Sequence, residues 1–449
     1  MASAAEQLAA NINLGAFAKA DELKKRIWFT LGALIVARIG AYIPLPGIDA
    51  AAFAQIFQQH SGGVLGMVDM FSGGAISRMT VFALGIMPYI SASIIMQLLT
   101  SVSPQLEQLK KEGESGRKKI NQYTRYGTVG LAAIQAFGMA NGLIKLAGPS
   151  GSAVIDPGIN FIVTAVFTLT AGTCFLMWLG EQITARGIGN GISLIIFAGI
   201  VARLPTAVEQ MLQQLWTGSI SGTFVLIVAV MVVAVITGIV FFERAQRRLI
   251  VQYPKRQVGT KMFGGESSHL PLKLNSSGVI PPIFASSLLL LPLTVAGFYG
   301  SSAGAPTWLQ TVMAYIGHGK PLYIVLYCAL IVFFAFFYTA IVFNPDDTAD
   351  NLKKYNGFIP GIRPGKSTAE YLDYVLTRLT VLGAAYLCVV CALPEVLIAN
   401  YAIPFYFGGT SLLIVVSVTM DTVAQIHSHL LAHQYEGLIK KAKLRGRNR

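Results

Sequence analysis

The segment Gly62–Thr100, GGVLGMVDMFSGGAISRMTVFALGIMPYISASIIMQLLT, decides the fold. Its first part carries Asp69 and Arg78 and is too short and too rich in glycine to cross a bilayer. From Met79 to Thr100 the segment is continuously apolar and long enough to cross as a helix. Non-helical backbone at membrane depth is tolerated only where it lines protein or water, so the first part predicts a water-filled cavity or a re-entrant segment.

The composition outside this segment is that of a membrane protein. Hydrophobic residues make up 54% of the chain and charged residues 12%, and the apolar runs are too long for strands. We therefore predict an all-α integral membrane protein. The start of the chain lacks a basic stretch followed by an apolar core, so no cleavable signal peptide is expected. The four cysteines fall within apolar runs and do not suggest a disulfide framework.

Hydropathy predicts ten spanning helices, with both chain termini in the cytoplasm. Alternate loops and the tail hold 29 of the 34 basic residues, and the positive-inside rule places these segments in the cytoplasm. The predicted spans are Ile27–Ile43, Met79–Thr100, Tyr126–Ile144, Ile159–Leu179, Ile188–Ala202, Phe224–Phe242, Val279–Phe298, Leu322–Phe343, Leu379–Ile398 and Ile403–Met420.

Two short segments indicate an internal duplication. GIMPYISAS (85–93) and GVIPPIFAS (278–286) share Gly, Pro, Ile, Ala and Ser in register, and each leads into an apolar helix. A chance match between two membrane segments is the alternative. Five spans in each half make the halves inverted relative to each other, and inverted halves usually place the transport path at their interface. We therefore expect the path between helices two and seven.

The spans offer isoleucines where a solute carrier would offer charges. A carrier normally buries charged groups at its site, and no coupling-ion site is found here. An apolar constriction excludes water and binds nothing that passes, which suits an unfolded polypeptide. Packing in the membrane is the alternative for each of these isoleucines: Ile86, Ile90, Ile192, Ile196, Ile280, Ile283 and Ile414.

Three other sequence patterns, a glycine run, a histidine group and two basic loops, allow more than one interpretation. The run Gly187–Gly191 follows no strand and lacks a phosphate-binding Lys-Ser/Thr, so close helix packing is favoured over nucleotide binding. His427, His429 and His433 have spacing compatible with a metal site of an intramembrane enzyme, but a solvated tail helix is favoured. Two basic loops, 243–278 and 344–378, suggest docking of a large acidic partner by their length together with their charge; the positive-inside bias is the alternative explanation of the charge.

Long ordered strings make the chain resemble the SecY family of bacterial protein-conducting channels over nearly its whole length. The strings are MFSGGAISRMTVFALGIMPYISASIIMQLL (70–99), EGESGRKKINQYTRYGT (112–128), GEQITARGIGNGIS (180–193), HLPLKLNSSGVIPPIFASS (269–287), NPDDTADNLKKYNGFIPGIRPG (344–365) and FGGTSLLIVVSV (407–418).

The resemblance implies roles for particular residues around a central hourglass pore. A plug at 62–75 includes Gly66, Met67, Asp69, Phe71, Ser72 and Gly73. A pore ring consists of Ile86, Ile90, Ile192, Ile196, Ile283 and Ile414. A polar cluster of Ser91, Gln135 and Ser287 closes a lateral gate. Lys255, Arg256 and Arg363 match loop positions used by the ribosome and by a motor ATPase.

The expected organisation is two inverted halves and a tail. Residues 1–210 form the half with helices one to five, residues 211–430 the half with helices six to ten, and residues 431–449 a basic cytoplasmic tail. The resemblance implies the plasma (inner) membrane of a bacterium as the location, and it implies no enzyme activity, catalytic residue, metal or cofactor. The implied partners are the small membrane subunits SecE and SecG, the ATPase SecA, ribosomal RNA and proteins, signal peptides with nascent chains, and membrane lipids. A secondary solute transporter with inverted repeats is the alternative function.

Overall fold

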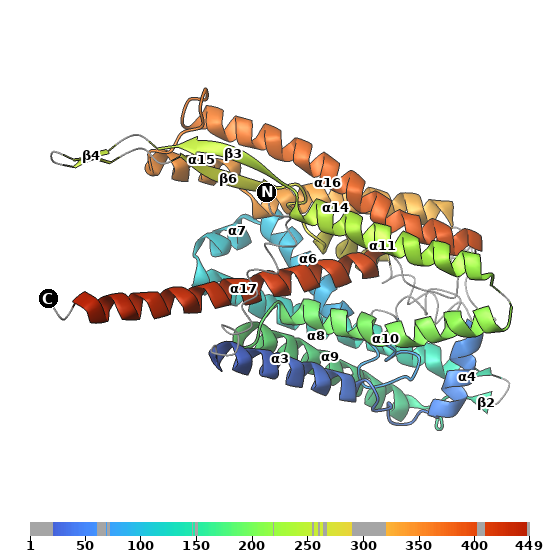
Figure 1. Cartoon of the computed structure of the whole chain (residues 1–449). Coiled ribbons are helices and arrows are strands. Elements are labelled where there is room, and N and C mark those ends of the chain that lie inside the picture. Colours follow the sequence, from blue (N-terminus) through green and yellow to red (C-terminus); the bar gives the residue numbers. More distant parts are fainter. Residues whose placement is uncertain are drawn as a thin grey trace. The chain divides into compact units, whose positions relative to one another are not determined.

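The computed structural model is mainly helical (Figure 1). It describes residues 21–60, 69, 72–145, 147–148, 151–218, 220–253, 256–258, 261–263, 267–289, 320–401 and 409–446. The helices are α3 (Asp21–Gly40), α4 (Ala50–His60), α6 (Met87–Val102), α7 (Pro104–Lys111), α8 (Glu114–Lys145), α9 (Ile159–Arg186), α10 (Gly191–Trp216), α11 (Gly222–Arg244), Ile280–Leu289, α14 (Pro321–Val342), α15 (Pro345–Lys354), α16 (Lys366–Tyr401) and α17 (Gly409–Gly446).

Each predicted span overlaps one of these helices, in chain order: α3, α6, α8, α9, α10, α11, Ile280–Leu289, α14, α16 and α17. Among the described residues, seven helices are long and apolar enough to cross a membrane, and α6 and Ile280–Leu289 are shorter apolar helices. The described strands are short antiparallel pairs in connecting segments: β1 (Ala147–Gly148) with β2 (Gly151–Ser152), β3 (Gln246–Gln252) with β6 (Ser267–Lys273), and β4 (Arg256–Val258) with β5 (Lys261–Phe263). The all-α prediction is confirmed for the spans.

The predicted start of the second span is wrong. The structure has turns from residue 81 to residue 86 and begins α6 at Met87. The chain diverges because its backbone groups bond elsewhere: Met79 O accepts from Leu45 N at 2.9 Å, and Val81 N donates to Ile43 O at 3.0 Å. Gly85 then adopts a φ of +56°, which interrupts a helix.

Several predicted spans are shorter than the observed helices, because hydropathy detects only the apolar part of a helix. The fifth span is predicted to stop at Ala202, but α10 continues to Trp216 through Arg203 and Pro205. In the same way α8 and α16 begin twelve and thirteen residues before the predicted spans, at Glu114 and Lys366. Amphipathic helix ends carry polar residues on their exposed face, so hydropathy does not detect them.

The two matching segments have the same local backbone. Gly85 and Gly278 both have positive φ, +56° and +62°, and a helix begins two residues after each, at Met87 and at Ile280. This equivalence favours duplication over a chance match. The inverted relation of the two halves stays a prediction.

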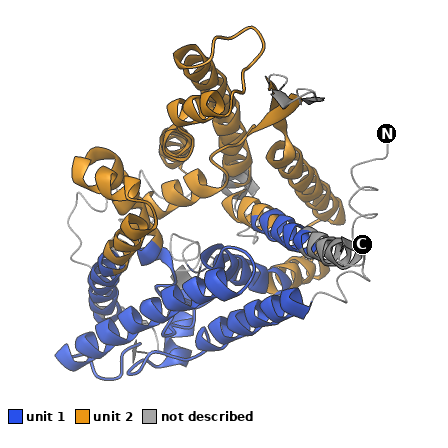
Figure 2. Cartoon of the chain, turned by 90° about the vertical axis from the view of Figure 1, so that its left-hand side faces the viewer, with its two compact units in different colours: residues 1–89, 126–205, 418–449 blue, residues 90–125, 206–417 orange. Residues whose placement is uncertain are grey.

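Contacts divide the chain into two compact units, coloured separately in Figure 2. Unit 1 comprises residues 1–89, 126–205 and 418–449, and unit 2 comprises residues 90–125 and 206–417. In unit 1, α3 packs against α9, and α4 lies on β1. In unit 2, α16 packs against α11, α14 and α15.

The glycine run before α10 packs closely in unit 1, as predicted. A Cβ on Gly191 would overlap the carbonyl of Gly180, and one on Gly187 would overlap the Thr30 hydroxyl. The backbone N–H of Ile188 donates to Thr30 Oγ1 at 3.1 Å, and that of Gly189 donates to Gln425 Oε1 at 2.8 Å. The run therefore joins α3 to α17 and provides no cradle for phosphate.

Candidate functional site

A turn segment in unit 1, consisting of residue 69 and residues 72–80, is organised by Asp69. Its backbone carbonyl accepts from Gly74 N at 2.9 Å and from Ser72 Oγ at 3.0 Å. Its carboxylate Oδ1 accepts from Ser77 N at 2.7 Å. The Asp69 side chain is only 1% exposed, so this short polar residue closes the turn from inside.

Two arginines from neighbouring helices hold the turn segment. Arg203 on α10 forms an ion pair with Asp69 Oδ2, and its Nη2 also donates to Ser77 Oγ at 3.0 Å. Arg38 on α3 donates from Nη1 to the Gly73 carbonyl at 2.9 Å. A half-buried guanidinium offers several donors in a fixed plane, which suits it to bind a carboxylate and a hydroxyl together. The turn segment is thus tied to α3 and to α10.

Glycines allow the turn segment to approach these helices. Gly73 and Gly74 have φ values of +67° and +88°, a region that disfavours other residues. A Cβ on Gly73 would lie 2.5 Å from Arg38 Nη1 and 2.7 Å from Gly199 Cα. The sequence Ser72-Gly-Gly therefore serves both the backbone conformation and close packing.

Two isoleucines of the predicted pore ring lie beside the turn segment. Ile86 and Ile196 line a cavity of about 40 Å³ together with Ser72, Arg38 and Gly199, all in unit 1. Both isoleucines are buried. The cavity therefore brings Ser72 of the turn segment close to two of the predicted ring residues, whose role in a pore stays a prediction.

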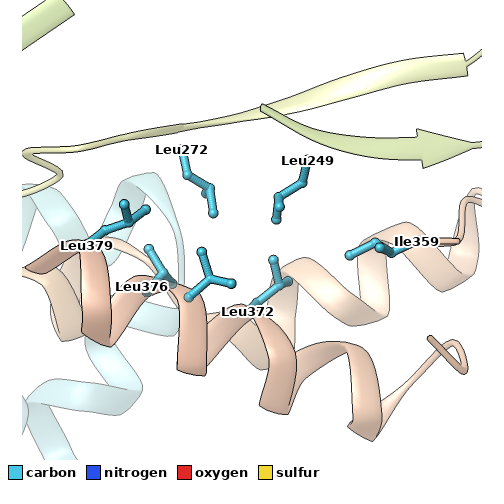
Figure 3. Close-up of a cluster of buried hydrophobic side chains, with 7 residues drawn as sticks. Leu249, Leu272, Ile359, Leu372, Leu376 and Leu379 are labelled. Atoms are coloured by element: carbon cyan, nitrogen blue, oxygen red, sulfur yellow. The ribbon is translucent and has the colours of Figure 1, made fainter. Parts of the chain in front are cut away.

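The two long basic loops form one body in unit 2, which we call the hairpin body. It contains the β3–β6 hairpin, residues 357–362 and the start of α16. Gln252 and Phe358 exchange backbone hydrogen bonds at 2.9 and 3.0 Å. Figure 3 shows leucines of the hairpin pointing toward α16. The buried cluster consists of Leu249, Leu272, Ile359, Leu372, Val375, Leu376 and Leu379.

The hairpin body presents Arg363 at its surface. Arg363 is exposed and precedes α16, and its carbonyl accepts from Thr368 Oγ1 at 2.9 Å. The backbone of Arg256 lies in β4, whereas Lys255 lies outside the described residues. An exposed arginine beside this packed cluster is suited to bind a carboxylate or phosphate group of a partner.

The family model named SecY matches residues 80–423 of this chain. The protein translocase subunit SecY of Escherichia coli K12 is 56% identical over 428 residues, which cover 95% of this chain and 96% of that protein. The chain belongs to the SecY family. SecY proteins are channel subunits of membranes and not enzymes, so the matches support the channel and do not support the solute transporter.

Solved channel structures share the fold at low sequence identity. A structure described as a protein-conducting channel matches with a TM-score of 0.67 and 19% identity, covering 91% of this chain and 92% of the other. The Sec61 channel from the canine ribosome–channel complex of the endoplasmic reticulum matches with a TM-score of 0.63 and 18% identity, covering 91% and 92%. The SecY fold is therefore shown by sequence and by structure.

The remaining residues of the SecY pore ring come from both units, so their convergence stays a prediction. Ile192 belongs to unit 1, and Ile90, Ile283 and Ile414 belong to unit 2. Ile414 is completely buried and Ile90 is buried, whereas Ile192 and Ile283 are half-buried. Gly66, Met67 and Phe71 of the predicted SecY plug lie outside the described residues.

The predicted SecY gate residues are all buried or half-buried in the structure. Ser91 on α6 and Ser287 are buried in unit 2, and Gln135 on α8 is half-buried in unit 1. Ser287 Oγ donates to the Ile283 carbonyl of its own helix at 2.7 Å. Its hydroxyl proton is therefore bonded within its own helix.

The main site residue that sequence reasoning missed is Arg203. Its position after an apolar run predicts a loop, whereas it lies in α10 and binds Asp69. Arg38 on α3 is a second such residue, because it donates to the Gly73 carbonyl. In the described part of the chain, no group of three potential metal ligands is found. His427 and His429 lie in α17, and the side chain of His433 is outside the description.

Proposed function

We propose that this chain is the central subunit of a Sec translocon, a passive channel that secretes unfolded proteins and releases membrane proteins sideways into the lipid. The cavity that Ser72 of the turn segment lines together with Ile86 and Ile196, within a chain of the SecY family, carries this proposal. In the resting state the turn segment blocks the outer side of the pore as its plug.

Opening follows from apolar burial and requires no covalent chemistry. A signal peptide is an apolar helix, and it enters between helices two and seven because burial there removes its side chains from water. The plug then leaves, and the ring of Ile86, Ile90, Ile192, Ile196, Ile283 and Ile414 surrounds the nascent chain. Isoleucine side chains form no hydrogen bonds, so the ring accepts any sequence.

The energy for transport comes from partners bound at the cytoplasmic loops. The hairpin body receives the SecA ATPase or the ribosome through Arg363, Lys255 and Arg256. The resemblance to a Sec61 channel that is named from a ribosome–channel complex supports the ribosome as a partner. SecE and SecG are the expected small subunits, and lipids surround the lateral gate.

A transport assay tests the function directly. Inner-membrane vesicles that contain this chain as their only SecY protein should protect a secretory precursor from added protease when ATP and SecA are present. Vesicles from which this chain has been depleted are the control. Precursor that stays accessible at normal abundance of the complex contradicts the proposal.

We further propose the inner membrane of a bacterium as the location, with both termini in the cytoplasm. The distribution of 29 of 34 basic residues supports this orientation. Single cysteines at Lys145 or Lys320 should react with an impermeant thiol reagent from outside intact cells, whereas cysteines at Arg117 or Arg363 should not. The reverse labelling pattern would invert the topology.

A further inference from the structure

Both oxygens of the buried Asp69 carboxylate have partners, and one of these partners is Arg203. Asp69 Oδ2 receives the guanidinium of Arg203, and Oδ1 receives Ser77 N at 2.7 Å. The same guanidinium donates to Ser77 Oγ at 3.0 Å. Arg203 therefore connects Asp69 and Ser77 of the turn segment to α10 within unit 1.

A buried carboxylate keeps its charge only where partners replace the water that it lost. The Asp69 side chain is 1% exposed, whereas that of Arg203 is 36% exposed. If the turn segment moves away from α10, the ion pair separates and each charged group needs water or another partner in its place. If one partner is removed by mutation, the other charge or its hydrogen-bonding groups stay without compensation, which strongly destabilises the buried arrangement. The pair therefore favours one position of the segment.

We propose that the Asp69–Arg203 pair is a latch that positions the turn segment in the resting channel, so that opening requires the pair to separate. This inference rests on the proposed channel function and identifies Arg203 as the positioning residue for the plug. Arg38 contributes a second attachment, but it binds the carbonyl of Gly73 and no carboxylate of the turn segment.

The latch differs from a purely structural ion pair in what it controls. A structural pair stabilises the fold of α10 and the turn, and its loss lowers the unfolding temperature without opening the resting channel. A latch also controls the leak of small ions through the closed channel, and it controls how strong a signal peptide must be. Leak and signal dependence therefore separate the two roles.

The first experiment measures leak in vesicles containing the reconstituted translocon with the full chain. Asp69→Asn and Arg203→Gln should each raise the resting ion leak about tenfold or more, because one half of a buried pair is left uncompensated. The double variant should leak no more than either single variant, since the two residues act as one unit. Asp156→Asn is the matched control because Asp156 is exposed in unit 1, and its leak should equal that of the wild type.

Conservative variants keep the test informative if the neutral variants fold poorly. Arg203→Lys and Asp69→Glu retain both charges but change the geometry, so each should leak at an intermediate level at wild-type abundance. All latch variants should also export precursors with weakened signal peptides better than the wild type does. Wild-type leak in folded single variants, or independent effects that multiply in the double variant, would overturn the latch.

A thermal-unfolding cycle distinguishes this failure from failure of the proposed function. The four chains of the double-mutant cycle should show coupling in their unfolding temperatures whether or not the chain transports proteins. Coupling with unchanged leak rejects the latch and leaves the channel function intact. A wild-type complex that transports no precursor rejects the channel function, and the latch proposal then falls with it even if the pair is coupled.

Discussion

Two arginines of this protein illustrate how the surroundings of a side chain decide its use. Arg203 is partly buried and bound to Asp69, so its guanidinium serves an internal contact. Arg363 is exposed on the hairpin body, and its backbone is fixed by the bond from Thr368 Oγ1 to its carbonyl. Because the backbone at Arg363 is already held, binding of a partner has to order only the side chain there, which makes Arg363 suitable for docking.

Reversing the charge of Arg363 should impair transport while leaving the protein inserted. Arg363→Glu removes the planar donors that a carboxylate partner needs and repels that partner. We expect ATP-driven secretion to fall about tenfold, as for the loss of a charged contact at an interface, with normal abundance in the membrane. Secretion kinetics in vesicles and immunoblotting provide the two measurements.

The matched control for Arg363 is Lys353→Glu. Lys353 is exposed in the last turn of α15 and belongs to the same compact unit, so this change alters the net charge equally. Its effect should be clearly smaller. Equal losses in the two variants would indicate a general effect of charge, and normal secretion in Arg363→Glu would remove this residue from the interface.

At the residue scale the sequence predicts which side chains matter better than it predicts their partners. Asp69 belongs to the plug by resemblance, but 134 residues separate it from Arg203. A pairing at that separation has no local pattern, and the apolar runs on either side suggest only two independent segments. The glycines of the turn segment were informative because their conformational requirement is local.

Among the elements, the hairpin body shows how two distant loops become one structure. The β3–β6 hairpin has an exposed face and a buried face, and the buried face carries Leu249 and Leu272. Leu372 and Leu376 lie one helical turn apart on α16 and complete the cluster. The backbone bridge from Gln252 to Phe358 adds the second loop to the hairpin.

Truncating the centre of this cluster should destabilise the hairpin body. Leu372 is fully buried, so Leu372→Ala should cost about 2–5 kcal/mol of local stability through lost burial and a residual cavity. Limited proteolysis of the purified chain should then cleave the β3–β6 hairpin faster, and secretion should weaken because the docking surface loses its support.

Thr377→Ala is the control for this prediction. Thr377 is exposed on the same helix, and its replacement should change neither the cleavage rate nor secretion. If both variants are cleaved at the wild-type rate, the leucine cluster does not hold the hairpin on α16.

The elements also show where sequence reasoning reaches its limit. The spans are predictable because a bilayer demands long apolar runs, and each predicted span overlaps a helix. The hairpin body is not, because its loops are recognised only by length and charge. Strands β3 and β6 pair through backbone groups, and alternation over seven residues is a weak pattern beside spans of twenty.

For the chain as a whole, the two matching segments suggest an internal duplication. Gly85 and Gly278 share a positive φ, and a helix begins two residues after each of them. Duplicated helix starts give the two predicted halves equivalent elements. The lateral gate is expected where these equivalent helices meet, and Ser91 and Ser287 lie six and nine residues after the two glycines.

A disulfide between these helices tests whether the path opens there. In the predicted gate, polar contacts among Ser91, Gln135 and Ser287 would contribute only about 0.6 kcal/mol each in a membrane interior. Burial of one leucine-sized side chain of a signal peptide yields about 1.5–3 kcal/mol, which is enough to open such a gate.

Ser91→Cys combined with Ser287→Cys should form a disulfide if the Cα atoms lie within about 7 Å. Oxidation should then stop translocation, and reductant should restore it, in a chain whose four native cysteines are replaced by alanine. Ser93→Cys with Ser287→Cys is the control, because neighbouring positions two residues apart on a helix face different directions. If the first disulfide forms and proteins still cross at the normal rate, the path does not open between helices two and seven.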